Sequence, residues 1–100
     1  MWEGSLDRFQ RMKRDRIANI LYELYERDGE AELREFSGSI AVNYGIRRQT
    51  LSEYLEDLKA AGIIEVRKDR ILLKWSKEKT EDWLEKQGVV ALRKEEGRKQ

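Results

Sequence analysis

The strongest constraint in the sequence lies in residues 37–58, where two helical patterns meet at a short turn. Ala41 stands four residues before Gly45, and Ile46 follows the glycine. Two helices cross closely only where small side chains let their backbones approach, and Ala41 is such a residue. Gly45 suits the turn because glycine adopts a positive φ without steric cost. The segment therefore predicts two helices that cross closely around a tight turn.

Apolar residues on both sides of this turn are spaced to anchor the second helix against the first. They are Ile40, Tyr44, Ile46, Leu51 and Leu55. Together with Leu58, the last two leucines recur at helical spacing, which predicts a helix from about residue 47 to residue 61. We expect Gly62 to end this helix.

Two more helical segments are expected earlier in the chain. Apolar residues recur at helical spacing over residues 6–27, and Asp28-Gly29 provides a stop. The same period continues over residues 33–44. Gly38 lies inside this second segment and costs about 1 kcal/mol relative to alanine. A break at Ser37-Gly38-Ser39, with Ser39 capping a new start, therefore stays open as an alternative.

The pattern changes in residues 63–75, IIEVRKDRILLKW, which are rich in β-branched and aliphatic side chains around a polar centre. This pattern predicts a β-hairpin. Ser76 is placed to cap a further helix that runs through Gln87 and stops at Gly88. The expected fold class is α+β and mainly α, with a three-helix core, a hairpin and an extra C-terminal helix. We assign residues 1–88 to one domain and expect residues 89–100 to be a charged tail, partly disordered.

Composition excludes several classes of function. The sequence contains no cysteine and no histidine, which removes disulfides, thiolate and imidazole metal ligands, and the usual general base. It also contains no phosphate-binding loop and no recognisable pair of nucleophile and base. We therefore expect no catalytic residues, no metal, no cofactor and no enzymatic activity.

Charge and hydropathy narrow the partners less sharply. The 21 basic and 20 acidic residues give a net charge of +1 and a pI near 7.9, below the range typical of nucleic-acid-binding domains. No apolar run approaches the ~18 residues that would indicate a membrane span, and the first ten residues lack the apolar stretch of a signal peptide. We expect a cytoplasmic protein with no membrane partner.

The order of these elements resembles that of winged helix-turn-helix regulators, including the multiple-antibiotic-resistance and arsenical-resistance repressor families. The resemblance covers about residues 17–75. The phrase TLSEYLEDLKAAGIIEV, residues 50–66, is similar to the junction between recognition helix and wing in those proteins. It implies that the helix over about 47–61 enters the major groove of duplex DNA, with the wing over 63–75 on the backbone or minor groove. The expected function is that of a single-domain prokaryotic transcriptional regulator.

Residue chemistry agrees with this implication at the start of the recognition helix. Its first turn and a half carries Arg47, Arg48, Gln49 and Ser52. Arginine can read guanine edges and glutamine adenine edges, whereas the alternative for these side chains is an ordinary solvated surface. No Ser, Thr, Asp or Asn directly precedes Arg47, so the first N–H groups stay available for a DNA phosphate. Acidic residues further along predict docking by the N-terminus: Glu53, Glu56 and Asp57.

The polar centre of the hairpin supplies three more candidate DNA-binding residues. They are Arg67, Lys68 and Arg70. Contact with DNA phosphates is one interpretation, and protection of the hairpin edge against aggregation is the other. We expect the first.

Apolar residues near the chain ends exceed what the core of such a domain needs. They predict a second partner besides DNA, a homodimer joined through the N- and C-terminal helices. The surplus set comprises Trp2, Leu6 and Phe9 with part of the group Trp83, Leu84, Val89, Val90 and Leu92, for which simple core packing is the alternative. A symmetric dimer would place its recognition helices about 34 Å apart. Because fold does not fix function, the rival hypothesis is a winged-helix adaptor that binds protein in a transcription or replication assembly. The near-neutral charge and the acidic second half of the recognition helix favour this rival.

Overall fold

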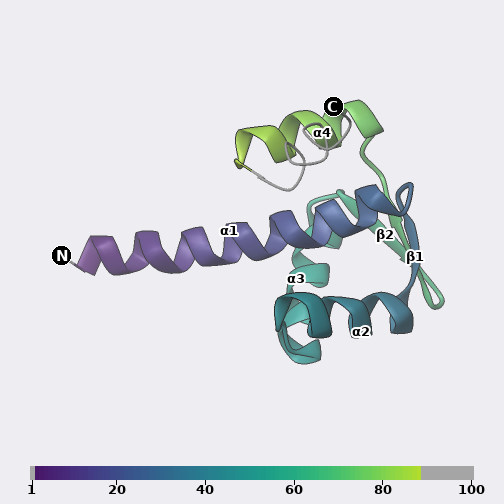
Figure 1. Ribbon diagram of the computed structural model, residues 1–100, viewed down its shortest axis with the longest axis horizontal. Helices are drawn as coiled ribbons and strands as arrows, with labels where there is room; N and C mark the ends of the chain where they lie inside the picture. Colours follow the sequence, from purple (N-terminus) through teal and green to yellow (C-terminus); the bar gives the residue numbers. More distant parts are fainter. Residues whose placement is uncertain (1, 89–100) are drawn as a thin grey trace, which may run out of the picture.

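The computed structural model describes the main chain over residues 2–88 and side chains from residue 10 onward. Within this range the order of elements is α1 (Trp2–Glu26), β1 (Glu30–Glu32), α2 (Leu33–Tyr44), α3 (Arg48–Ala60), β2 (Ile64–Arg67), β3 (Arg70–Leu73) and α4 (Lys77–Lys86). In Figure 1, α4 lies on one side of α1, and α2 and α3 lie on the other. This arrangement confirms the expected winged helix-turn-helix fold with an additional C-terminal helix.

Helix α1 is longer than the sequence pattern predicted. It begins at Trp2, four residues before the expected start at Leu6, and its first half extends beyond the rest of the molecule (Figure 1). Residues 10–15 are exposed, and among the described side chains of α1 the first buried one is Ala18, after the partly buried Ile17. The predicted stop is confirmed, because Asp28 and Gly29 both have a positive φ, of 60° and 82°. Although α1 has 25 residues, no helix in the described part is long and apolar enough to cross a membrane.

Helix α2 is continuous, so the alternative of a break at Gly38 is wrong. The side chains of Phe36 and Ile40 are fully buried on either side of this glycine. Burial of each such side chain stabilises the fold by about 1.5–3 kcal/mol, which outweighs the cost of about 1 kcal/mol for a helical glycine.

The turn between α2 and α3 forms as predicted. Gly45 has φ 66°, and its N–H donates to the carbonyl oxygen of Ala41 at 3.0 Å. Ile46 directly after the glycine is buried, and Ala41, the predicted crossing residue, is partly buried. Three buried leucines then pack α3 against the core: Leu51, Leu55 and Leu58.

The sheet contains one strand that the sequence did not predict. The hairpin of β2 and β3 is confirmed, but β1 pairs with the free edge of β3, which gives the antiparallel order β1-β3-β2. In this pairing Ala31 lies opposite Ile71, and both are buried. A strand of three residues is too short for alternation to reveal, and its pairing depends on a partner 40 positions away.

Helix α4 begins where the sequence predicted. The Ser76 hydroxyl accepts a hydrogen bond of 3.1 Å from the N–H of Lys79, and Gly88 after the helix has φ 73°. Leu84 is fully buried in the core that α4 shares with α1, which favours the core alternative for this residue over a surplus dimer surface. Trp83 is partly buried, with its ring 5.9 Å from that of Trp75. Residues 89–100, with Val89, Val90 and Leu92, lie outside the described residues.

Candidate nucleic-acid interface

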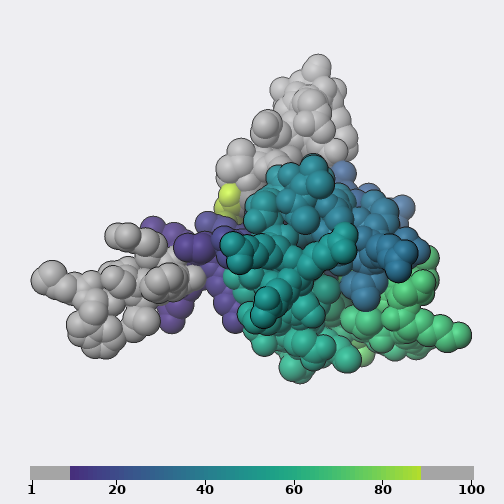
Figure 2. Space-filling model, turned by 90° about the horizontal axis from the view of Figure 1, so that it is seen from below, coloured from purple at the N-terminus to yellow at the C-terminus, as the bar shows by residue number. Residues whose placement is uncertain are grey.

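Helices α2 and α3 and the hairpin of β2 and β3, the wing, share one face of the molecule. Figure 2 views this face, with α3 near its centre, α2 beside it and the wing along one margin. All seven predicted DNA-binding residues belong to α3, its N-cap or the wing. The face therefore brings together the two groups of residues that lie apart in the sequence.

The candidate residues of α3 are all exposed at its N-terminal end. Arg47 is the N-cap with an extended backbone (φ −64°, ψ 151°), and Arg48 begins the helix. Within the described part of the chain, no side-chain hydrogen bond or ion pair engages Arg47, Arg48, Gln49 or Ser52. Their hydrogen-bonding groups are therefore available to a partner.

The backbone at this end of α3 is available as well. No side chain caps the helix at Arg47, so N–H groups of the first turn lack an intrahelical partner and carry the positive end of the helix dipole. Towards the other end Asp57 pairs with Lys13 of α1 at 2.8 Å, and this hydrogen bond and its charge raise the pKa of Lys13. The favourable end for an anion is thus the N-terminus.

The wing arginines are held by the protein's own carboxylates, which the sequence did not reveal. Arg67 pairs with Glu65 at 2.6 Å on the same strand, and Arg70 pairs with Glu30 of β1 at 2.7 Å. The hydrogen bond from Arg67 lowers the pKa of Glu65. The arginine side chains remain 71% and 50% exposed, and exposed ion pairs of this kind contribute little to stability. An external phosphate can therefore compete for these arginines.

Lys68 differs from the two arginines because no carboxylate pairs with it within residues 10–88. It lies exposed in the turn between β2 and β3 and has φ 54°, a left-handed conformation that is unusual for lysine. Of the three wing cations, Lys68 is the one that a phosphate can approach without displacing a partner.

A shallow open groove joins α2, α3 and the tip of the wing. Its lining residues are Leu33, Arg34, Ser37, Arg48 and Asp69. Sequence reasoning missed Arg34 and Ser37 as candidates, although Arg34 is the only basic residue between positions 28 and 45. No local signal marked either residue, because the groove forms only where α2, α3 and the wing come together. The groove adds a second cation and a hydroxyl beside Arg48.

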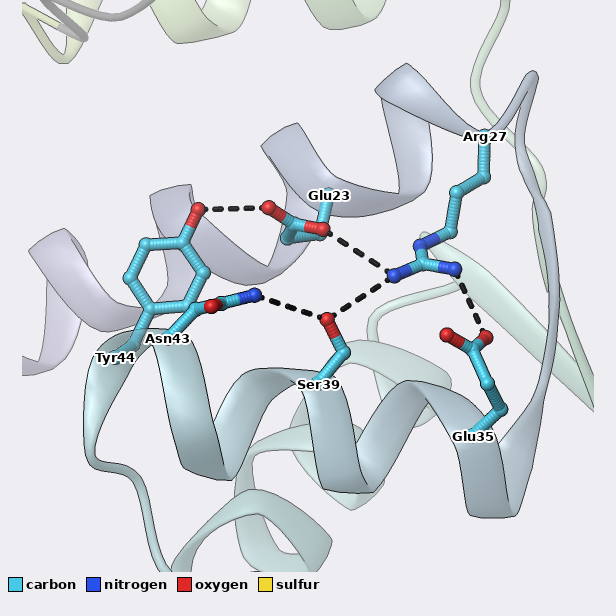
Figure 3. Close-up of polar contacts among 6 residues, drawn as sticks. All are labelled: Glu23, Arg27, Glu35, Ser39, Asn43 and Tyr44. Atoms are coloured by element: carbon cyan, nitrogen blue, oxygen red, sulfur yellow. Dashed lines mark hydrogen bonds and ion pairs between the residues drawn. The ribbon is translucent and has the colours of Figure 1, made fainter.

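A polar network fixes α2 to the last turns of α1 and so positions the whole face (Figure 3). The Arg27 guanidinium donates to Glu35 at 2.8 Å and to Ser39 at 3.1 Å, and it pairs with Glu23 at 3.5 Å. Glu23 also accepts a hydrogen bond of 2.9 Å from the hydroxyl of Tyr44, close to the turn before α3. Burial, followed by the hydrogen bond to Glu23, raises the pKa of Tyr44 above its usual value.

A family model of the Crp-like helix-turn-helix domain matches residues 15–77. No curated protein and no solved structure matches the chain. The matched range starts within α1, contains the whole α2–turn–α3 unit and the wing, and ends at the first residue of α4. This match supports DNA binding and a role in transcription regulation, and it agrees with the exposed residues at the start of α3. The chain belongs to the Crp-like helix-turn-helix domain family.

Proposed function

We propose that this protein is a transcriptional regulator that binds specific sequences of duplex DNA, with the N-terminal end of α3 in the major groove. The observation that carries the proposal is the set of exposed side chains at the start of α3, which have no side-chain partner among the described residues. Arginine there can donate two hydrogen bonds to guanine, and Gln49 can do the same for adenine. In this proposal the chain works in the cytoplasm and catalyses no reaction.

Phosphate contacts would come from both sides of α3. On one side, the groove offers Arg34 and Ser37 next to Arg48. On the other side, Lys68 of the wing contacts the DNA backbone directly. Arg67 and Arg70 contact it by exchanging their carboxylate partners for phosphate. These contacts position the protein, whereas base contacts from α3 select the sequence.

A homodimer completes the proposed regulator, and α1 supports it better than α4 does. The first half of α1 extends beyond the rest of the molecule (Figure 1). An isolated helical segment of this length is marginally stable in water. A second copy lying along it would supply the missing packing. By contrast, α4 already packs on α1 of its own chain through Leu84. Two recognition helices about 34 Å apart would then read a palindromic site.

Selection of binding sites from a random duplex library tests the proposal. The protein should enrich a defined, two-fold symmetric sequence. Arg47→Ala or Arg48→Ala should reduce the preference for that sequence over random DNA by about 10- to 100-fold, as expected for loss of an arginine–guanine pair. Lys59→Ala is the matched control, because Lys59 is an exposed cation in the last turn of the same helix.

The outcome also separates DNA binding from the adaptor hypothesis. Loss of sequence preference in the arginine variants, with retained thermal stability, supports major-groove recognition. If the library yields no enriched sequence and both arginine variants instead lose a protein partner, the adaptor function replaces this one.

A further inference from the structure

A small hollow opens between the end of α1, the end of β3 and the start of α4. Figure 1 shows α4 on the side of α1 opposite to α2 and α3, so the hollow lies away from the proposed DNA-binding face. Its volume of about 160 Å³ is close to that of the engineered ~150 Å³ cavity that binds benzene. The lining residues are Tyr25, Asp28, Gly29, Leu73, Trp75 and Lys77.

The two aromatic side chains that line the hollow are held in place by contacts with α4. The hydroxyl of Tyr25 donates a hydrogen bond to the Glu81 carboxylate of α4. The ring of Trp75 packs against that of Trp83 with the centroids 5.9 Å apart. A ligand therefore meets rings that are already positioned, which lowers the entropic cost of binding.

The backbone at the base of the hollow is fixed as well. The N–H of Leu73 donates to the carbonyl oxygen of Gly29 at 2.8 Å, which joins the end of β3 to the turn after α1. Gly29 has φ 82° and contributes no side chain to the lining. This hydrogen bond fixes the turn after α1 against the end of β3, so the backbone of the hollow is preformed, as in many small-molecule sites.

Two opposite charges flank these aromatic side chains. Asp28 lies in the turn after α1, and Lys77 begins α4 with its Nζ 5.8 Å from the centre of the Tyr25 ring. Neither side chain forms an ion pair with any other residue between 10 and 88. An aromatic anion would be attracted by Lys77 but repelled by Asp28. An aromatic cation would be attracted by Asp28 but repelled by Lys77.

We propose that the hollow binds a small aromatic zwitterion, a single ring that carries both an ammonium and a carboxylate group, as an aromatic amino acid does. The ring packs against Tyr25 and Trp75, for which offset or tilted contacts between aromatic rings are favourable. The carboxylate accepts hydrogen bonds from Lys77, and the ammonium donates to Asp28. The volume limits the ligand to about one ring.

The full-length chain without DNA is titrated with L-phenylalanine, while tryptophan fluorescence and amide and indole NMR signals are recorded. We expect saturation with a half-point below about 10 mM, and shifts centred on the Gly29 amide and the Trp75 indole. Benzoate and benzylammonium each lack one charge and should bind about tenfold more weakly.

Two neutralising variants test the role of each charge. Asp28→Asn keeps a residue that tolerates a positive φ, and Lys77→Gln retains most of the side-chain length. Each should weaken L-phenylalanine binding about tenfold. In addition, Asp28→Asn should strengthen binding of benzoate, and Lys77→Gln that of benzylammonium. Lys86→Gln, at the other end of α4, is the matched control and should leave every titration unchanged.

The absence of saturation up to about 10 mM would overturn the proposal, as would equal affinity for the three probes. Signal shifts that are confined to other parts of the chain would overturn it too. DNA binding by the same sample is measured separately, so failure of this site says nothing against the proposed DNA-binding function.

Discussion

The backbone N–H of Leu33 donates a hydrogen bond of 2.6 Å to the carbonyl oxygen of Asp69, which joins the first residue of α2 to the tip of the wing. The pairing of β1 with β3 fixes the same region through Ala31 and Ile71. The wing therefore cannot swing independently of the two crossed helices. We expect α3 and the wing to meet DNA as one rigid unit.

Replacement of Glu30 or Glu65 by glutamine should tighten binding to random duplex DNA by a few fold. Each change removes a carboxylate that competes with phosphate for Arg70 or Arg67. Glu78→Gln, at an exposed position of α4, serves as the control in the same binding titration. Unchanged affinity in both the Glu30 and the Glu65 variant would indicate that the arginines do not reach DNA.

Lys68→Asn should weaken DNA binding more than Arg67→Ala or Arg70→Ala, because Lys68 alone among the wing cations lacks a carboxylate partner within the described residues. The slope of log affinity against log salt should become shallower by about 1 for this single change. Asparagine tolerates the φ of 54° at this position, so the hairpin should stay folded. Circular dichroism checks folding, and an equal or smaller effect than in the arginine variants is incompatible with this ranking.

Tyr44→Phe should lower the free energy of unfolding by about 1 kcal/mol near neutral pH, because it removes the hydrogen bond to Glu23. The folded protein raises the pKa of Tyr44 above the ordinary value of 10.0, so its neutral form is favoured. The resulting stability is fully present below pH 10 and is lost as the pH rises above it. Denaturant titrations should thus show the difference between wild type and variant shrinking above pH 10. A constant difference would argue against this linkage.

Gly38→Ala and Gly45→Ala should change stability in opposite directions, although a new Cβ would meet nothing within 4 Å at either position. Gly38 is helical, so alanine should stabilise the protein by about 0.5–1 kcal/mol. Gly45 has φ 66°, where alanine is strained and should destabilise by at least about 1 kcal/mol. Thermal unfolding of both variants measures the contrast. Effects of equal sign would show that backbone conformation does not decide the outcome.

Local signals made the helix ends predictable from the sequence, and distant contacts did not leave such signals. Gly45 and Ser76 act through their own backbone or side chain, so the turn and the start of α4 were predicted correctly. The ion pair of Arg70 depends on Glu30, which lies 40 positions earlier and comes close only because β1 pairs with β3. Arg34 joined the candidate site for the same reason, since the groove exists only once α2, α3 and the wing are assembled.

The most direct measurement is a salt titration of binding to random duplex DNA, from about 50 to 200 mM salt. Log affinity should fall linearly with log salt, with a slope of about −0.9 for each phosphate contacted. A combined Arg34→Ala, Arg48→Ala and Lys68→Asn variant should make the slope shallower by about 3, one for each cation removed, while Lys59→Ala leaves it unchanged. Absence of any binding at about 50 mM salt, by a folded wild-type chain, would show that the protein does not bind DNA through this face.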